Sequence, residues 1–282
     1  MDELVSVIVA TYNREDALDA VLRSLARQAD TRFEVLVADD GSRAATAEVV
    51  AAWASRMAMP LKHVWHDDRG FRLAEIRNRA IRASNGGYCI FLDGDCITRP
   101  DYIAAHRALA EPGYFVIGNR ILLSPEMTAC ILADGLEPEG WRLARFLALS
   151  WRGGINRVAP LIALPLGPLR KLGGRRWRGA RGCNVACFRA DLDRIDGFDA
   201  AFTGWGREDS DLFVRLIRSG VRRKDGRFAT GVLHLWHPES ERSRLSENQA
   251  KLDHILQCDR LRAERGLSAL EVEAAQAAPG VR

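Results

Sequence analysis

Lysine is scarce in this 282-residue chain, with only four among its 41 cationic residues, so guanidinium groups carry nearly all the positive charge. Arginine can bind phosphate with a planar, two-pronged fork, although arginine-favouring codons are the preferred explanation for most of this bias. Long apolar runs are also missing. None reaches about 18 residues, so no membrane-spanning helix is expected. The acidic start and its short apolar run do not fit a signal peptide. We therefore expect a cytoplasmic protein with a modest net charge of +4.

A disulfide framework is missing as well. The six cysteines follow no regular spacing, which favours reduced thiols in a cytosolic protein. Cys183 and Cys187 could form a zinc site with His234 and His237. The four-residue step and the absence of a second cysteine pair make that alternative weak.

The first 120 residues alternate short β-rich runs with amphipathic helical stretches. Strands are expected at 5–10, 33–38, 61–65 and 88–92, then at 184–188 and 228–235, with helices at 44–54 and 245–267. Strands that alternate with helices predict right-handed βαβ units and an α/β fold with a mostly parallel sheet. Ligands of such sheets bind beyond the carboxyl ends of the strands. The polar clusters of the first 95 residues all fall at such ends.

Asp93 and Asp95 close the strand at 88–92, separated by Gly94. Successive carboxylates on an extended chain face opposite ways, but a glycine between them permits a turn that aims both at one ion. Mg²⁺ and Mn²⁺ take oxygen ligands and share their coordination with substrate phosphates. The triplet therefore predicts a divalent-metal site that neutralises a nucleotide diphosphate.

Five ordered segments resemble the markers of family 2 glycosyltransferases, whose GT-A fold is a Rossmann-like, nucleotide-sugar-binding α/β fold. They are 9–14 (VATYNR), 39–42 (DDGS), 70–81 (GFRLAEIRNRAI), 93–95 (DGD) and 204–209 (GWGRED). The last is similar to a segment of β4-galactosyltransferases and of bacterial chondroitin- and hyaluronan-type polymerases. The resemblance spans roughly residues 5–237, most of the chain.

This resemblance implies a role for individual side chains. The residues implied to bind the nucleotide-sugar are Thr11, Asn13, Arg14, Asp40, Arg77, Asp93, Asn184 and Trp205. Asp40, rather than Asp39, would accept from the N3–H of a uracil, and the other aspartate would serve as a turn and helix cap. Arg77 would approach the phosphates, with a solvated arginine on the helix face as its alternative. Asp93 would contact the ribose, and Asn184 would border the donor sugar.

Glu208 and Asp209 follow two glycines and Trp205. An inverting transfer needs a carboxylate that takes the proton from an acceptor hydroxyl. The resemblance implies that Asp209 is this base and that Glu208 holds hydroxyl groups. Both acids would also stabilise the first turn of a helix, by about 0.3–1 kcal/mol each.

The resemblance also implies that a histidine near the end of the resembling region is the remaining metal ligand. Asp95 would bind the metal directly, with His234 as its partner and His237 as the alternative. Imidazole is softer than carboxylate or water, which favours Mn²⁺ over Mg²⁺. The other histidines, including His63 and His66, are expected to be structural or on the surface.

Residues 140–190 contain eleven cations and not one acid. This basic segment could be an active-site lid with glycine hinges, a solvated loop, or a surface for an anionic acceptor or the inner membrane. Apolar runs beside its cations favour acceptor binding near a membrane. It lacks the regularly interleaved aromatic residues of a nucleic-acid stacking platform.

We therefore expect an inverting, metal-dependent glycosyltransferase that moves a hexose or N-acetylhexosamine from a UDP-sugar to a hydroxyl of a bacterial surface glycan, such as lipopolysaccharide or capsule. The alternatives are a nucleotidyltransferase that activates a sugar phosphate and a basic nucleic-acid-binding protein. Three regions are expected: a nucleotide-sugar-binding half (1–120), an acceptor-binding and catalytic half (121–240) with the basic loop 140–182, and a C-terminal helical extension (241–282).

Overall fold

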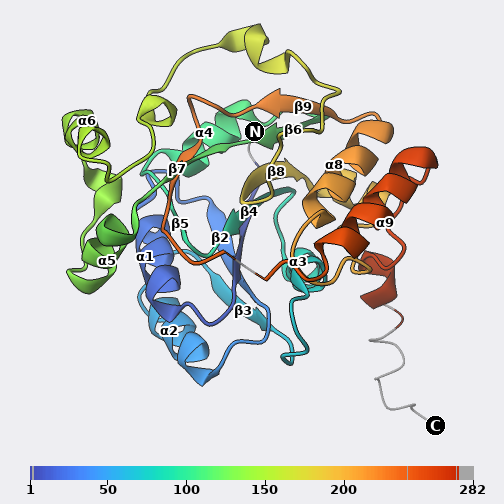
Figure 1. Ribbon diagram of the computed structural model, residues 1–282, viewed down its shortest axis with the longest axis horizontal. Helices are drawn as coiled ribbons and strands as arrows, with labels where there is room; N and C mark the ends of the chain where they lie inside the picture. The colour runs from blue at the N-terminus through green and yellow to red at the C-terminus, as the bar shows by residue number, and fades with distance from the viewer. Residues whose placement is uncertain (2, 240, 271, 273–282) are drawn as a thin grey trace.

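The computed structural model describes residues 1, 3–239, 241–270 and 272. Its main feature is a seven-stranded sheet in the order β3-β2-β1-β4-β8-β6-β9 (Figure 1). The strands are β1 Val5–Thr11, β2 Phe33–Asp39, β3 Leu61–Trp65, β4 Tyr88–Asp93, β6 Tyr114–Ile117, β8 Asn184–Phe188 and β9 Arg222–Asp225. The first four are parallel, and β8 runs antiparallel to both β4 and β6. The expected α/β fold with a mostly parallel sheet is confirmed.

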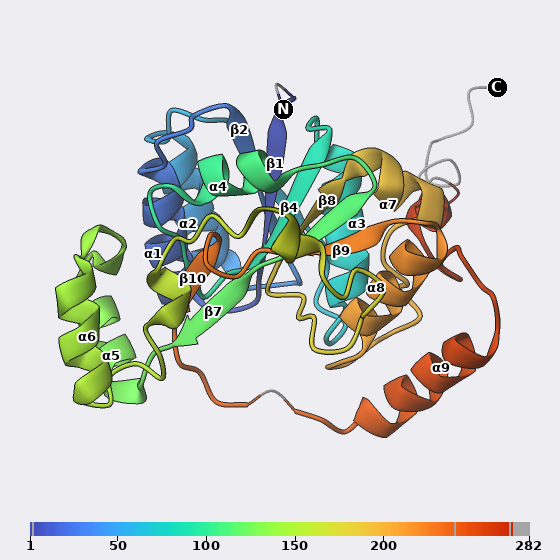
Figure 2. The same cartoon turned by 90° about the horizontal axis from the view of Figure 1, so that it is seen from above.

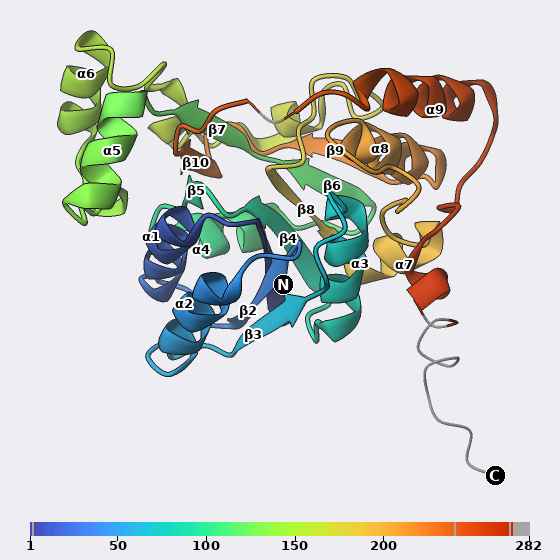
Figure 3. The same ribbon diagram turned by 60° about the horizontal axis from the view of Figure 1, so that its bottom comes forward.

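Helices cover both faces of this sheet (Figure 3). They are α1 Glu15–Ala26, α2 Ala44–Ala54, α3 Leu73–Ala83, α4 Tyr102–Leu109, α5 Pro125–Ala133, α6 Leu143–Trp151, α7 Arg189–Ile195, α8 Glu208–Arg218 and α9 Leu245–Gln257, with short 3₁₀ turns at Pro138–Gly140, Ala159–Leu161 and Gly167–Lys171. Alternate residues of a strand face opposite sides. Val7 accordingly packs in one core with α1, and Ile8 in a second core with α3 and α8.

A second, three-stranded sheet joins distant parts of the chain in the order β5-β10-β7. Its strands are β5 Cys96–Ile97, β7 Asn119–Leu122 and β10 Gly231–His234. β10 lies antiparallel to β5, with His234 opposite Cys96. This pairing carries the 231–237 segment to the end of β4.

Two sequence-based boundaries are wrong. The helix expected at 245–267 ends at Gln257, because Asp199 accepts hydrogen bonds from the backbone N–H groups of Glu264 and Arg265 and turns the chain back. The strand expected at 228–235 is only β10. Phe228 has φ +59° and lies in a turn, which precedes the strand.

The molecule has two ends on opposite sides of the main sheet (Figure 2). α5 and α6 project together at one end, and α8 and α9 lie at the other. Among the described residues, no helix has the length and apolar character needed to cross a membrane.

Candidate functional site

Loops that follow β1 and β2 are tied together at the carboxyl edge of the sheet. The N–H of Asn13 donates to Ser42 Oγ at 2.8 Å, and the N–H of Arg43 donates to Asn13 Oδ1 at 3.0 Å. Asn13 has φ +47°, a conformation that asparagine tolerates better than most residues. Thr11 lies at the end of β1, and its buried hydroxyl has no hydrogen-bond partner among the described residues. Arg14 is paired with Asp16 at 3.1 Å.

Asp39 and Asp40 have different hydrogen-bond partners. Asp39 is buried, accepts from the N–H of Ser42 at 2.8 Å and contacts His63 at 2.9 Å, so it is the turn-capping residue of the pair. Asp40 Oδ1 lies 2.7 Å from His66 Nε2, and its Oδ2 accepts from the N–H of Arg72 at 2.8 Å. Each carboxylate oxygen has a further lone pair. Asp40 can therefore still accept from a ligand.

His66 is the site-adjacent residue that sequence analysis missed. It is buried between Asp40 and Glu75, with its Nδ1 3.7 Å from Glu75 Oε1. Burial lowers the pKa of His66, but its hydrogen bond to Asp40 and the nearby carboxylate of Glu75 raise that pKa above the ordinary value overall. The nearby His66 imidazole, together with Arg79 and against the effect of burial, lowers the pKa of Glu75 to about 2. The available signal was its position directly after β3, at the edge where the other polar clusters lie.

Arg77 is buried on α3, which excludes the solvated-arginine alternative. Its Nη2 donates to Asp93 Oδ1 at 2.9 Å, and its Nη1 lies 3.9 Å from Glu208 Oε1. Its guanidinium also lies 5.3 Å from the centre of the Phe198 ring. Nε and Nη1 have no hydrogen-bond partner among the described residues. The structure thus brings one cation between the acid that ends β4 and the acid that begins α8.

Glu208 and Asp209 begin α8 directly after Arg207, which has φ +79°. Asp209 is half-buried, and its Oδ2 accepts from the N–H of Gly182 at 3.0 Å. Glu208 is buried, and its Oε2 has no hydrogen-bond partner among the described residues. Burial, followed by the charge of Asp209, raises the pKa of Glu208 to about 7. Near neutral pH this carboxyl can therefore both donate and accept hydrogen bonds.

Asp95, His234 and His237 form a cluster whose ligand atoms all lie within 4.8 Å of one another. His234 Nε2 is 3.6 Å from Asp95 Oδ1, and His237 Nε2 is 3.3 Å from Asp95 Oδ2. Burial lowers the pKa of His234, which favours the neutral imidazole that binds metals. A carboxylate with two imidazoles is a donor set that suits Mn²⁺ or Zn²⁺ better than Mg²⁺. The residues therefore fit a transition-metal ion, with both histidines placed to take part.

Close backbone packing explains the glycine between the two aspartates. The N–H of Gly94 donates to the carbonyl of Ala10 at 2.7 Å. A Cβ at this position would lie 2.7 Å from that oxygen and 3.1 Å from Thr11 Cβ. The mixed cysteine–histidine zinc site is not formed by the described residues, where the metal-type cluster contains Asp95 in place of Cys183 and Cys187.

Asn184 is buried at the start of β8 and bonds within the protein. Its Oδ1 accepts from the Tyr102 hydroxyl at 3.0 Å, and its Nδ2 donates to the carbonyls of Thr230 at 2.6 Å and Asn119 at 3.2 Å. His106 Nε2 lies 3.2 Å from the same Oδ1. A contact between Asn184 and a sugar stays a prediction.

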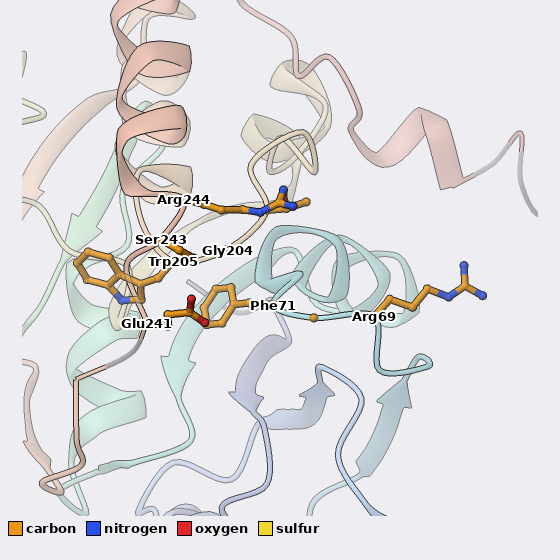
Figure 4. A pocket seen from close by; sticks show the side chains of 9 residues that line it. Arg69, Phe71, Gly204, Trp205, Glu241, Ser243 and Arg244 are labelled. Atoms are coloured by element: carbon orange, nitrogen blue, oxygen red, sulfur yellow. The ribbon is translucent and has the colours of Figure 1, made fainter.

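A pocket of about 450 Å³ lies beside the start of α8. It is lined by Arg69, Gly70, Phe71, Thr203, Gly204, Trp205, Glu241, Ser243 and Arg244. Figure 4 shows the Phe71 ring, Trp205 and Glu241 together, with Arg69 extending away from them. The N–H of Gly204 donates to the Phe71 carbonyl at 2.9 Å. Arg242 stacks 4.9 Å from the centre of the Trp205 ring. Two half-exposed aromatic rings with charged neighbours suit an apolar sugar face and its hydroxyl rim.

Two family models match the chain: glycosyl transferase family 2 over residues 6–156, and the N-terminal domain of galactosyltransferase over residues 173–238. Validoxylamine A glucosyltransferase from Streptomyces hygroscopicus subsp. limoneus is 33% identical over 267 residues, covering 91% of this chain and 56% of that protein. Chondroitin synthase from Escherichia coli is 28% identical over 234 residues, covering 77% of this chain and 32% of that protein. The chain thus spans little more than half, or less, of these relatives' length.

Solved structures with low sequence identity share the fold. S. aureus TarS in complex with UDP has a TM-score of 0.60 at 16% identity, covering 94% of this chain and 68% of that one. The mannosyltransferase PcManGT from Pyrobaculum calidifontis, in complex with GDP-Man and Mn²⁺, has a TM-score of 0.55 at 19% identity, covering 100% and 77%. The expected GT-A fold is confirmed.

Proposed function

The chain belongs to glycosyl transferase family 2, and on that premise we propose that it transfers a hexose or N-acetylhexosamine from a UDP-sugar to a hydroxyl of a bacterial surface glycan, with inversion at the anomeric carbon. The observation that carries this proposal is the cluster of Asp95, His234 and His237 at the carboxyl edge of the sheet. Family membership weighs against both alternatives, a nucleotidyltransferase and a nucleic-acid-binding protein.

Asp40 and Asp93 are the proposed nucleoside contacts. Asp40 is held by His66 and the Arg72 backbone, so its carboxylate is fixed before a uracil arrives. Arg77 already bonds to Asp93 and retains unpartnered N–H groups. Those donors suit a phosphate oxygen. The UDP-bound TarS structure supports uracil as the base, whereas PcManGT binds a guanosine nucleotide.

Asp95 and His234, with His237 as the alternative to His234 or a third ligand, are the proposed holders of Mn²⁺, or of Mg²⁺. A cation bound there would neutralise the charge that develops on the leaving diphosphate. The same three side chains offer one carboxylate and two imidazole rings as ligands. PcManGT, a fold relative solved with Mn²⁺, supports this assignment.

Asp209 is the proposed general base. Its Oδ2 is oriented by the N–H of Gly182, and its Oδ1 by the N–H of Ser210 at 2.6 Å, which leaves lone pairs for an acceptor hydroxyl. The proton moves to Asp209 as the hydroxyl oxygen bonds to the anomeric carbon and the sugar–phosphate bond breaks. Glu208 can hold sugar hydroxyls as donor or acceptor. The pocket beside Trp205 is the proposed acceptor site.

The proposed acceptor is a glycan or glycolipid, including anionic ones, in contact with the cytoplasmic face of the inner membrane. Its main support is the basic segment at 140–190. The chondroitin synthases that resemble the chain make a polysaccharide by name. The validoxylamine A glucosyltransferase is named for a different acceptor. Transfer to an acceptor of that kind, instead of to a surface glycan, would contradict this part of the proposal.

The proposal is tested by calorimetry of UDP binding with and without Mn²⁺, followed by a panel of UDP- and GDP-sugars scored for nucleotide release. We expect UDP to bind at least about tenfold more tightly with Mn²⁺, and Asp95→Asn to abolish that gain. Asp209→Asn should bind UDP like the wild type and transfer about 10²- to 10⁴-fold more slowly. UDP binding that ignores Mn²⁺, or turnover confined to GDP-sugars, would contradict the proposal.

A further inference from the structure

Helix α6 exposes an apolar stripe to solvent. Leu143, Leu147 and Trp151 have 43%, 55% and 88% of their surface accessible. They are four residues apart, and each such step turns only about 40° around a helix. All three therefore lie on one face, which we call the α6 stripe. Monomeric proteins seldom expose large apolar groups in a contiguous row without a binding partner.

The helix is firmly attached to the protein despite this exposure. Phe146, on another face of α6, is fully buried and packs in the main core. Its ring lies 5.8 Å from that of Trp141, and Arg99 approaches it at 5.9 Å. The core contact orients α6 and leaves the stripe outside. Figures 2 and 3 show α5 and α6 projecting at the end of the molecule opposite α9.

Cations accompany the stripe without neutralising acids. Arg142, Arg145 and Arg152 are all exposed, and none has an ion pair within the part of the chain that the structure describes. The preceding acids, Glu137 and Glu139, both pair with Arg27. No acid occurs from 140 to 190. Arg142 and Arg152 adjoin the two ends of α6, next in sequence to Leu143 and Trp151, and Arg145 stacks 3.6 Å from the centre of the Trp141 ring. The charge around α6 is thus complementary to an anionic partner.

We propose that the α6 stripe and its three arginines dock the protein on an anionic lipid bilayer. Leucine and tryptophan side chains on one helix face enter the boundary between headgroups and acyl chains, with tryptophan favoured at that depth. The guanidinium groups at the two ends of α6 and on its neighbouring face bind lipid phosphates. A second copy of this chain is the rival occupant, but the unpaired positive charge would repel the same charge on that copy.

This inference rests on the proposed function in one respect: it names the membrane surface that would present a glycolipid acceptor. The contact itself needs neither donor nor metal. Vesicle binding measured without nucleotide therefore tests it separately. A protein that binds vesicles but does not bind UDP would contradict the proposed function and leave the membrane contact standing.

The experiment is co-sedimentation with vesicles of phosphatidylcholine alone or mixed with phosphatidylglycerol. We expect the full chain to partition to the mixed vesicles at least about tenfold more strongly, and salt to weaken this binding. Leu147→Ser/Trp151→Ser should reduce partitioning about tenfold, as should Arg142→Gln/Arg145→Gln/Arg152→Gln. The matched control, Leu256→Ser/Leu261→Ser, removes exposed leucines from the opposite end and should bind like the wild type.

The thermal unfolding midpoint of every variant, measured without nucleotide or vesicles, reports that its fold is intact. Equal partitioning to both vesicle types, no partitioning, or unchanged partitioning of the stripe variant would overturn the proposal. So would a concentration-dependent dimer, seen by sedimentation velocity without vesicles, that the stripe variant abolishes. That result would assign the stripe to self-association.

Discussion

Glu208 is a single side chain whose ionisation the surrounding protein opposes. Its pKa of about 7 lies above the ordinary 4.5, so the folded protein binds its proton more tightly than the unfolded chain does. Stability is then fully present below pH about 4.5 and declines until pH about 7, where the folded form also ionises. The cost comes from burying a carboxylate next to the charge of Asp209, and the guanidinium of Arg77, at 3.9 Å, offsets it only in part.

Replacing this acid should separate its stability cost from its function. We expect Glu208→Gln to raise the free energy of unfolding by about 1–3 kcal/mol at pH 8 and to leave it nearly unchanged at pH 4. Transfer activity should fall at both values. Urea titrations across this pH range make the measurement, with the exposed Glu48→Gln as control. A stability gain that is equal at both pH values would show that burial of the charge is not the cause.

Residues in motifs could be predicted individually, and isolated residues could not. Asp95 and His234 lie in recognisable segments, and the structure brings them together. His66 is a lone histidine after a strand, with no pattern to distinguish it from a surface residue. Its role depends on Asp40, 26 residues earlier. Only the pairing of β2 with β3 places them side by side.

Strand β8 illustrates the element scale, because its first residue joins four elements. Asn184 bonds to Tyr102 of α4, to Asn119 of β7 and to Thr230 just before β10. These bonds connect the two sheets through one buried amide. Sequence resemblance indicates a donor-sugar contact, whereas the geometry gives the side chain a structural task.

Asn184→Ala should therefore lower the free energy of unfolding by about 2–4 kcal/mol, because two carbonyls and a hydroxyl lose their partner in the interior. Tyr102→Phe removes one of these bonds and should cost about 1 kcal/mol. Chemical denaturation checks both values. If Asn184→Ala kept its stability and only raised the donor KM, the sugar-binding role would replace the structural one.

Long elements with regular patterns were predictable, and short or context-dependent ones were not. The strand at β3 and the helix at α2 have the predicted boundaries, since each depends on local patterning. β5 has two residues and exists only because β10 pairs with it. α9 ends early because the chain after Gln257 bonds to Asp199, a residue 58 positions before Gln257. No local signal encodes such a partner.

At the scale of the whole molecule, the region after α9 packs against the residues that follow α7. Asp199 accepts from Arg260 at 2.8 Å as well as from the backbone of Glu264 and Arg265. The segment that leads to α9 supplies Glu241 and Arg244 to the proposed acceptor pocket. Asp199 thus fixes the segment after α9, while the pocket-lining residues before α9 are held by Thr203, whose hydroxyl accepts from Arg244 at 2.7 Å.

Asp199→Ala should release the segment after α9. We expect faster trypsin cleavage at Arg260, Arg262 and Arg265, and an acceptor KM raised about three- to tenfold with little change in UDP affinity. Timed digestion followed by mass spectrometry locates the cuts. Asp253→Ala, which removes an exposed acid of α9 that accepts a hydrogen bond from Gln249, is the control and should digest like the wild type. Unaltered cleavage would mean that other contacts hold the C-terminal region.

The small sheet β5-β10-β7 has a consequence for protein synthesis. Its strand β10 pairs His234 with Cys96, the neighbour of Asp95. When residues 1–122 have been made, the growing chain holds Asp95 but neither His234 nor His237 of the candidate metal cluster. The cluster therefore cannot assemble before both histidines have been synthesised, and a product truncated before them carries one of its three side chains.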